Sequence, residues 1–146
     1  MAAVKTTNSA ATVPSNAAPT KSMPGKHRIG DDGAVRVVEI RSYRLLPGTR
    51  DEYDRLFREE ALPLLRLVEI DVIAAGPSID DPNGYYLMRA FDNLADRERR
   101  EDRFYSSPEW RNGPREAVVS KIEVYTDVVV ELDEATIEGL RRSLAL

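Results

Sequence analysis

The most regular pattern in the chain is the alternation of side chains in residues 35–45, VRVVEIRSYRL. Side chains alternate between the two faces of a strand, so this pattern predicts a strand with Glu39, Arg41 and Tyr43 on one face. If this polar row is buried, its groups must be paired and the row is a candidate pocket lining. If the row is open to solvent, it gives little indication of a functional site.

Apolar residues at helical spacing follow this strand. After a turn at residues 46–48, Thr49 and Glu52 have the spacing of a capping box at a helix start. The apolar positions that predict the amphipathic helix are Tyr53, Leu56, Phe57, Ala61, Leu64, Leu65 and Val68. Pro63 removes the backbone bond to the carbonyl of Glu59, which predicts a kink or a short break.

Two short apolar segments then predict an antiparallel hairpin. Residues 70–75 and 85–91 are its strands, and residues 80–84, DDPNG, form a strong turn cluster between them. Three oxygen-bearing side chains in this turn imitate part of a calcium loop: Asp80, Asp81 and Asn83. The glutamate that closes an EF-hand is missing, so the sequence favours turn chemistry over a metal site.

The stretch after the hairpin predicts helices in more than one piece. Residues 95–103 form the first, capped by Asp92 or Asn93, and their mixed charges are expected to be a solvated face with weak ion pairs. Ser-Pro at residues 107–108 restarts the helix, and Gly-Pro at residues 113–114 interrupts it.

The order of these elements predicts the fold class. Residues 123–132 are the last strand, and Asp133 begins a helix that ends near Leu144. Strand, helix, strand, strand, helix, strand is the ferredoxin-like β-α-β-β-α-β unit, an α+β fold with an antiparallel sheet. We therefore expect a domain in residues 35–132, followed by a short C-terminal helix in residues 133–146.

Such a sheet carries both helices on one face, so its other face needs a cover. The domain has no further element long enough to supply one. A second copy of the chain is therefore the expected cover, which makes a homodimeric α+β barrel with a space between the two sheets. If Val38 and Ile40 face the helices, the polar row at Glu39 faces this inter-sheet space.

Composition excludes several classes of function. The chain has 146 residues and no cysteine, and its one histidine, His27, lies before the first strand, so no metal site or cofactor is expected. Residues 1–34 carry a net charge of +2 and the rest carries −6. The acidic body argues against nucleic-acid binding, and no apolar run is long enough to span a membrane.

Residues 1–34 have the composition of a disordered tail, rich in Ala, Ser, Thr, Asn and Pro. Up to Gly30 this tail lacks acidic residues, as organelle transit peptides do, but it has one arginine and no apolar helical face. We expect a cytoplasmic protein, with an organelle matrix as the alternative if the tail is a transit peptide.

Several quoted segments resemble the NIPSNAP family of the dimeric α/β-barrel superfamily. They are EIRSYRLLPGT (39–49), LPLL (62–65), GPSIDDPNGYYLMRAF (76–91), FYSSPEWRNGPREA (104–117) and IEVYTDVVVEL (122–132). The resemblance implies a ferredoxin-like fold and a homodimer, and it implies no enzyme activity. Related members of the superfamily include small monooxygenases that oxidise quinol-like substrates without a metal, and haem-degrading enzymes.

The candidate site residues share one sheet face with the polar row. They are Glu39, Arg41, Tyr43, Arg89, Tyr125 and Asp127. Arg41 or Arg89 is suited to hold an anion, and Tyr43 or Tyr125 to donate to a developing oxyanion. The alternative is a purely structural ion-pair network. Trp110 is likewise a core or interface anchor, or else a wall of the pocket.

Two functions are therefore weighed. The first is a homodimeric NIPSNAP-like protein that binds a small, partly apolar ligand or a protein partner in or near the inter-sheet cavity. The alternative is a cofactor-independent monooxygenase acting on a quinol or polyphenol. Haem degradation ranks lower, because the body of the protein offers no histidine to bind iron.

Overall fold

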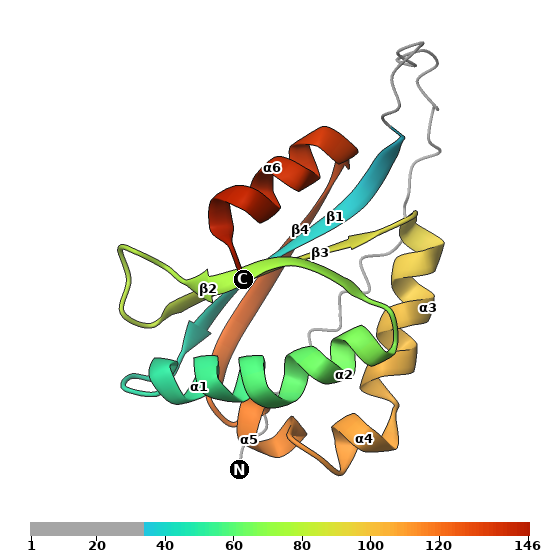
Figure 1. Ribbon diagram of the computed structural model, residues 1–146. Helices are drawn as coiled ribbons and strands as arrows, with labels where there is room; N and C mark the ends of the chain where they lie inside the picture. Colours follow the sequence, from blue (N-terminus) through green and yellow to red (C-terminus); the bar gives the residue numbers. More distant parts are fainter. Residues whose placement is uncertain (1–33) are drawn as a thin grey trace.

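A four-stranded antiparallel sheet organises residues 34–146, the part of the chain that the computed structural model describes (Figure 1). Its strands are β1 (Val35–Leu45), β2 (Asp71–Pro77), β3 (Gly84–Phe91) and β4 (Ile122–Asp133), in the order β2-β3-β1-β4. The predicted α+β, ferredoxin-like element order is confirmed. The predicted tail lies, apart from Ala34, outside the described residues.

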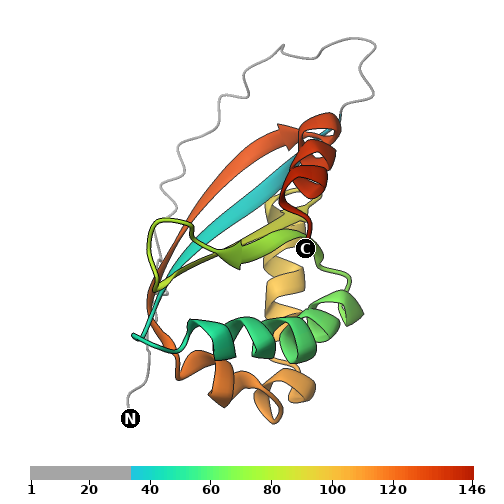
Figure 2. The ribbon, with the colours of Figure 1, turned by 60° about the vertical axis from the view of Figure 1, so that its left-hand side comes forward.

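The first helical layer is one run of three pieces, which lie end to end in Figure 2. These are α1 (Arg50–Leu56), a π-helical segment η1 (Phe57–Ala61) and α2 (Leu62–Leu67). The break predicted at Pro63 takes the form of η1, because proline has no N–H to continue the α-helical bonds. The predicted capping box is wrong: the Thr49 hydroxyl donates to the Leu46 carbonyl at 2.7 Å, and Glu52 pairs with Arg55 instead.

The second helical layer has three pieces as well, α3 (Leu94–Tyr105), α4 (Pro108–Arg111) and α5 (Arg115–Val119). The predicted caps are confirmed: Asn93 accepts from the Asp96 N–H at 2.8 Å, and Ser107 accepts from the Trp110 N–H at 3.3 Å. Gly113 separates α4 from α5. A Cβ at this position would lie 2.2 Å from the Glu109 carbonyl oxygen, so only glycine fits the break.

The two faces of the sheet carry separate cores. The larger core lies between the sheet and the helices α1 to α5, and it includes Tyr43 and Tyr85 from the sheet with Tyr53 from α1. Helix α6 (Glu134–Leu144) lies on the opposite face (Figure 1). It buries Ile137 against Val38 and neighbouring strand residues. As predicted, Asp133 caps α6 by accepting from the Thr136 N–H at 2.8 Å.

Two expectations about these faces are wrong. The polar row at Glu39 faces the helices, and Val38 faces away from them. The reason is that Tyr43 and Leu45 continue the polar row, and these large apolar rings and chains are the ones that pack on α1. The second wrong expectation is that no element of the chain covers the other face. Helix α6 covers part of that face, and Arg141 of α6 donates to Asp71 of β2 at 2.7 Å.

None of the helices within residues 34–146 has the length and apolar character required to cross a lipid bilayer.

Candidate functional site

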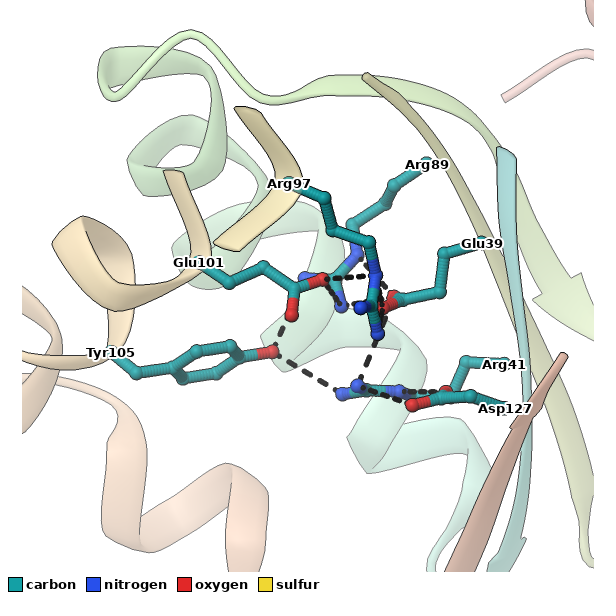
Figure 3. A network of polar contacts seen from close by, with 7 residues as sticks. All are labelled: Glu39, Arg41, Arg89, Arg97, Glu101, Tyr105 and Asp127. Carbon is teal, nitrogen blue, oxygen red and sulfur yellow. Dashed lines mark hydrogen bonds and ion pairs between the residues drawn. The ribbon is translucent and has the colours of Figure 1, made fainter. Parts of the chain in front are cut away.

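Glu39 and Arg89 form the centre of a buried polar network between the sheet and α3 (Figure 3). They are paired across β1 and β3, and neither side chain has any exposed surface. Arg89 Nε donates to Glu39 Oε1 at 3.0 Å, and Arg89 Nη2 makes a second bond to the same oxygen. The other carboxylate oxygen, Oε2, lies 2.7 Å from Nη2 of Arg97.

A second pair joins β1 to β4. Arg41 and Asp127 face each other in the strand register, and their guanidinium and carboxylate meet as a fork with N···O distances of 2.6 and 3.0 Å. The Arg41 guanidinium also lies 4.3 Å from the ring centre of Tyr125, a cation–π contact. Its Nη2 is 3.8 Å from Glu39, which links the two pairs into one network.

Helix α3 completes the network with three residues at spacing four: Arg97, Glu101 and Tyr105. Glu101 Oε2 accepts from Arg89 Nη2 at 3.1 Å. The Tyr105 hydroxyl oxygen accepts from Nη1 of Arg41 at 3.3 Å and from Nη1 of Arg89 at 3.2 Å. The prediction of a merely solvated helix face is therefore wrong for Arg97 and Glu101. Their shared helical face was the signal in the sequence that points to them.

Two neighbouring carboxyl groups of this network, Glu39 and Glu101, differ strongly in pKa. Burial alone raises the pKa of Glu39, but the attraction of Arg89 and a hydrogen bond with Glu101 outweigh it and hold that pKa far below its usual range. Burial raises the pKa of Glu101 to about 7, and its hydrogen bond to the ionised Glu39 acts in the same direction. Between about pH 5 and 7, the proton of this pair therefore resides on Glu101 and not on Glu39.

A cavity of about 760 Å³ lies beside the network. Arg41, Arg89, Glu101 and Tyr105 provide its polar wall. The opposite wall is apolar and aromatic, and it includes Phe57, Leu65, Leu87, Phe104, Trp110, Val118, Val119 and Ile122. Trp110 is only 5% exposed and packs in the core, as predicted, and it also lines this cavity; its part in holding a ligand stays a prediction.

The structure brings the six predicted site residues together. Arg41, Tyr43, Arg89 and Tyr125 line the cavity, whereas Glu39 and Asp127 stand behind the arginines as their counter-ions. The location differs from the prediction, because the cavity lies between sheet and helices within one chain and not between two sheets. The assignment of these residues to ligand binding stays a prediction.

The described part of the chain, residues 34–146, holds no cluster of His, Cys, Asp and Glu suited to a metal ion. In the β2–β3 turn, Asp81 Oδ1 accepts from the Asn83 N–H at 2.8 Å and Asp80 accepts from the Ser78 hydroxyl at 2.6 Å. These carboxylates serve the turn, as their spacing predicted.

Fold and site together define a ferredoxin-like α+β protein with a partly charged cavity between its sheet and its helices. The sequence profile of the NIPSNAP family matches residues 38–126, more than half of the chain. The chain belongs to the NIPSNAP family. The resemblance stated from the quoted segments is therefore confirmed.

Solved structures share this fold. A NIPSNAP family protein of unknown function from Agrobacterium tumefaciens is 24% identical, with a TM-score of 0.62 over 67% of this chain and 88% of that one. A second NIPSNAP family protein from the same organism is 23% identical, with a TM-score of 0.61 over 65% and 90%. A candidate antibiotic biosynthesis monooxygenase from Nitrosomonas europaea is 16% identical, with a TM-score of 0.51 over 68% and 91%. No curated protein matches the chain.

Proposed function

We propose that the protein binds a small, partly apolar molecule in the cavity between the sheet and helices α1 to α5. The observation that carries this proposal is the cavity itself, about 760 Å³ with one charged wall and one aromatic wall. Small-molecule sites typically combine an apolar lining with a few convergent polar groups in a space of this size.

Tyr105 supplies a directed donor to such a ligand. A phenol oxygen has two lone pairs and one proton. Arg41 and Arg89 take the two lone pairs, and no residue among 34–146 accepts the proton. The Tyr105 hydroxyl therefore has a proton available for an acceptor on the ligand, such as a carbonyl, ether or phenolate oxygen.

Filling the cavity tests this proposal. Val119 is a partly buried residue of the cavity wall, and Val119→Phe reduces the free space without removing a network residue. We expect this variant to bind 8-anilinonaphthalene-1-sulfonate about tenfold more weakly than the original protein, because the loss of well-packed apolar contact is worth on the order of 1–2 kcal/mol. The measurement is dye emission excited through Trp110, the only tryptophan of the chain.

The matched control is Val35→Phe, which places the same ring on an exposed residue outside the cavity. This control is expected to bind the dye as the original protein does. Equal binding by Val119→Phe and Val35→Phe, or an absence of energy transfer from Trp110, would refute the cavity as the binding site.

We also propose that the protein is a homodimer that pairs through the sheet face opposite α1 to α5. Helix α6 covers one end of this face, but the other end is open and carries Val124, Thr126 and Val128 of β4 beside Ile40 of β1. Val128 is 54% exposed, although it lies midway along β4 and pairs with Ile40 of β1. An exposed apolar sheet face supports burial by a second copy.

Val128→Glu is expected to convert the dimer into a monomer, because a carboxylate in a closely packed interface remains unpaired and costs several kcal/mol. Sedimentation velocity at micromolar concentration measures the change. Val35→Glu is the control, since Val35 is also 54% exposed but lies at the start of β1 on the other face. A monomeric original protein, or two variants that both remain dimers, would disprove this interface.

The oxygenase alternative is supported by the shared fold alone, as with the candidate monooxygenase from Nitrosomonas europaea at 16% identity. A fold does not carry an activity with it. Ligand binding is therefore the function that the site itself supports.

A further inference from the structure

Four arginines line the cavity, and only two of them are neutralised by closely bound carboxylates. Within the polar network the two lining arginines have carboxylate partners: Arg41 forks onto Asp127, and Arg89 contacts Glu39 and Glu101. These guanidinium groups have little capacity left for an external anion, because each is already held by short charge-assisted bonds.

Two further arginines line the same cavity without such partners. Arg111 ends α4 and Arg115 begins α5, and both are solvent-exposed, so they mark the mouth of the cavity. Arg111 makes no ion pair or hydrogen bond through its side chain to any residue in 34–146. Arg115 has only its neighbour Glu116, at 3.7 Å, and that carboxylate is 85% exposed.

The positive charge at the mouth of the cavity contrasts with the negative net charge of the chain. The chain has a net charge of −4, yet Glu101 is the one acidic residue among the cavity-lining residues described, against four arginines. A concave site lined by one sign of charge, with low-dielectric walls, concentrates ions of the opposite sign. Arg111 has no ion-pair partner among residues 34–146 and Arg115 has only the long contact with Glu116, so their charge favours an anion at the mouth.

The interior next to this mouth is apolar. Trp110, Val118 and Ile122 belong to the same segment of chain as the two arginines and line the same cavity. A simple inorganic anion would satisfy the arginines but leave this surface without contact. A neutral apolar molecule would leave Arg111 without an anionic partner and Arg115 with only its contact to Glu116.

We propose that the ligand of this cavity is an amphiphilic carboxylate, whose head group binds Arg111 and Arg115 and whose apolar body lies against Trp110. This inference rests on the proposed binding function and specifies its ligand class. Each guanidinium offers a planar pair of N–H donors that matches a carboxylate. On the polar wall of the cavity, where the Tyr105 ring lies 6.0 Å from that of Trp110, the free proton of the Tyr105 hydroxyl accommodates one oxygen acceptor on the body of the ligand.

Two probes with the same apolar body separate the contribution of the charge. These are 2-naphthoate, an anion, and 2-naphthalenemethanol, its neutral analogue, each titrated into the full chain by isothermal calorimetry. We expect the double variant Arg111→Met/Arg115→Met to bind 2-naphthoate at least about tenfold more weakly, because it loses two charge-assisted contacts. Its affinity for 2-naphthalenemethanol should change less than about twofold, since methionine keeps the apolar stem.

The matched control is Arg66→Met/Arg103→Met, which removes the same charge from two exposed arginines that do not line the cavity. This control should leave the affinity of both probes unchanged. If Arg111→Met/Arg115→Met binds 2-naphthoate normally, or loses both probes equally, the carboxylate site is wrong while the cavity remains a binding site. If neither probe binds the original protein, the proposed function fails as well.

Discussion

Replacing Arg89 with methionine is expected to lower the free energy of unfolding by about 3 kcal/mol, the lower end of the range for breaking a buried ion pair. Arg89 and Glu39 have no exposed side-chain surface, so the variant leaves the Glu39 carboxylate buried with fewer donors. The loss stays at the lower end because Arg97 still contacts Glu39 at 2.7 Å. Urea denaturation followed by circular dichroism measures this change.

Two comparisons show whether the loss comes from the buried charge. Arg99→Met removes an arginine that is 68% exposed and is expected to cost less than about 1 kcal/mol. The double variant Glu39→Met/Arg89→Met removes both charges and is expected to recover part of the loss. If Arg89→Met lowers the free energy of unfolding no more than Arg99→Met does, the buried network does not stabilise the fold.

Stability is also expected to fall as the pH rises from about 5 to about 7. Burial, with the hydrogen bond to Glu39, raises the pKa of Glu101 to about 7 in the folded protein, against 4.5 as its ordinary value. A group with a raised folded pKa contributes stability that is fully present below the unfolded value and is lost as the pH passes the folded value. The expected loss is about 2 kcal/mol, and urea titrations at several pH values measure it.

Glu101→Gln should remove this pH dependence, because glutamine does not ionise. Glu98→Gln, on the exposed side of the same helix, should keep it. Below about pH 4.5 both variants should lose stability together, since the pKa of Glu39 is held low and its protonation is unfavourable in the folded state. A flat profile between pH 5 and 7 in the original protein would contradict the assignment of the shared proton to Glu101.

The sequence predicted the elements of the fold better than their arrangement in space. Strand periodicity, the turn at residues 80–84 and the caps at Asn93, Ser107 and Asp133 all report local chemistry, and the structure confirms them. The side of the sheet on which the helices lie depends on long-range packing. Tyr43 and Leu45 determine which side this is, because α1 buries them. The polar row lies on the same face of β1 and therefore also faces the helices.

The candidate site was predicted from the strands alone, which explains what was missed. Arg97, Glu101 and Tyr105 belong to a helix whose charged sequence is typical of a solvated surface, and only their contacts with Arg89 and Arg41 show their part in the network. The mouth residues Arg111 and Arg115 flank a Gly-Pro break, and no periodic pattern relates them to the cavity.

The central position of β1 in the sheet has a consequence for the order of folding. β1 is the first strand along the chain, yet its two neighbours are β3 and β4, and Arg41 is 86 residues from its partner Asp127. Pairings between residues so far apart close large loops and form slowly. During synthesis, Arg41 of β1 therefore has no Asp127 to pair with until nearly the whole domain has left the ribosome. Misassembly is most favoured in this interval, because the charged face of β1 is still unpaired.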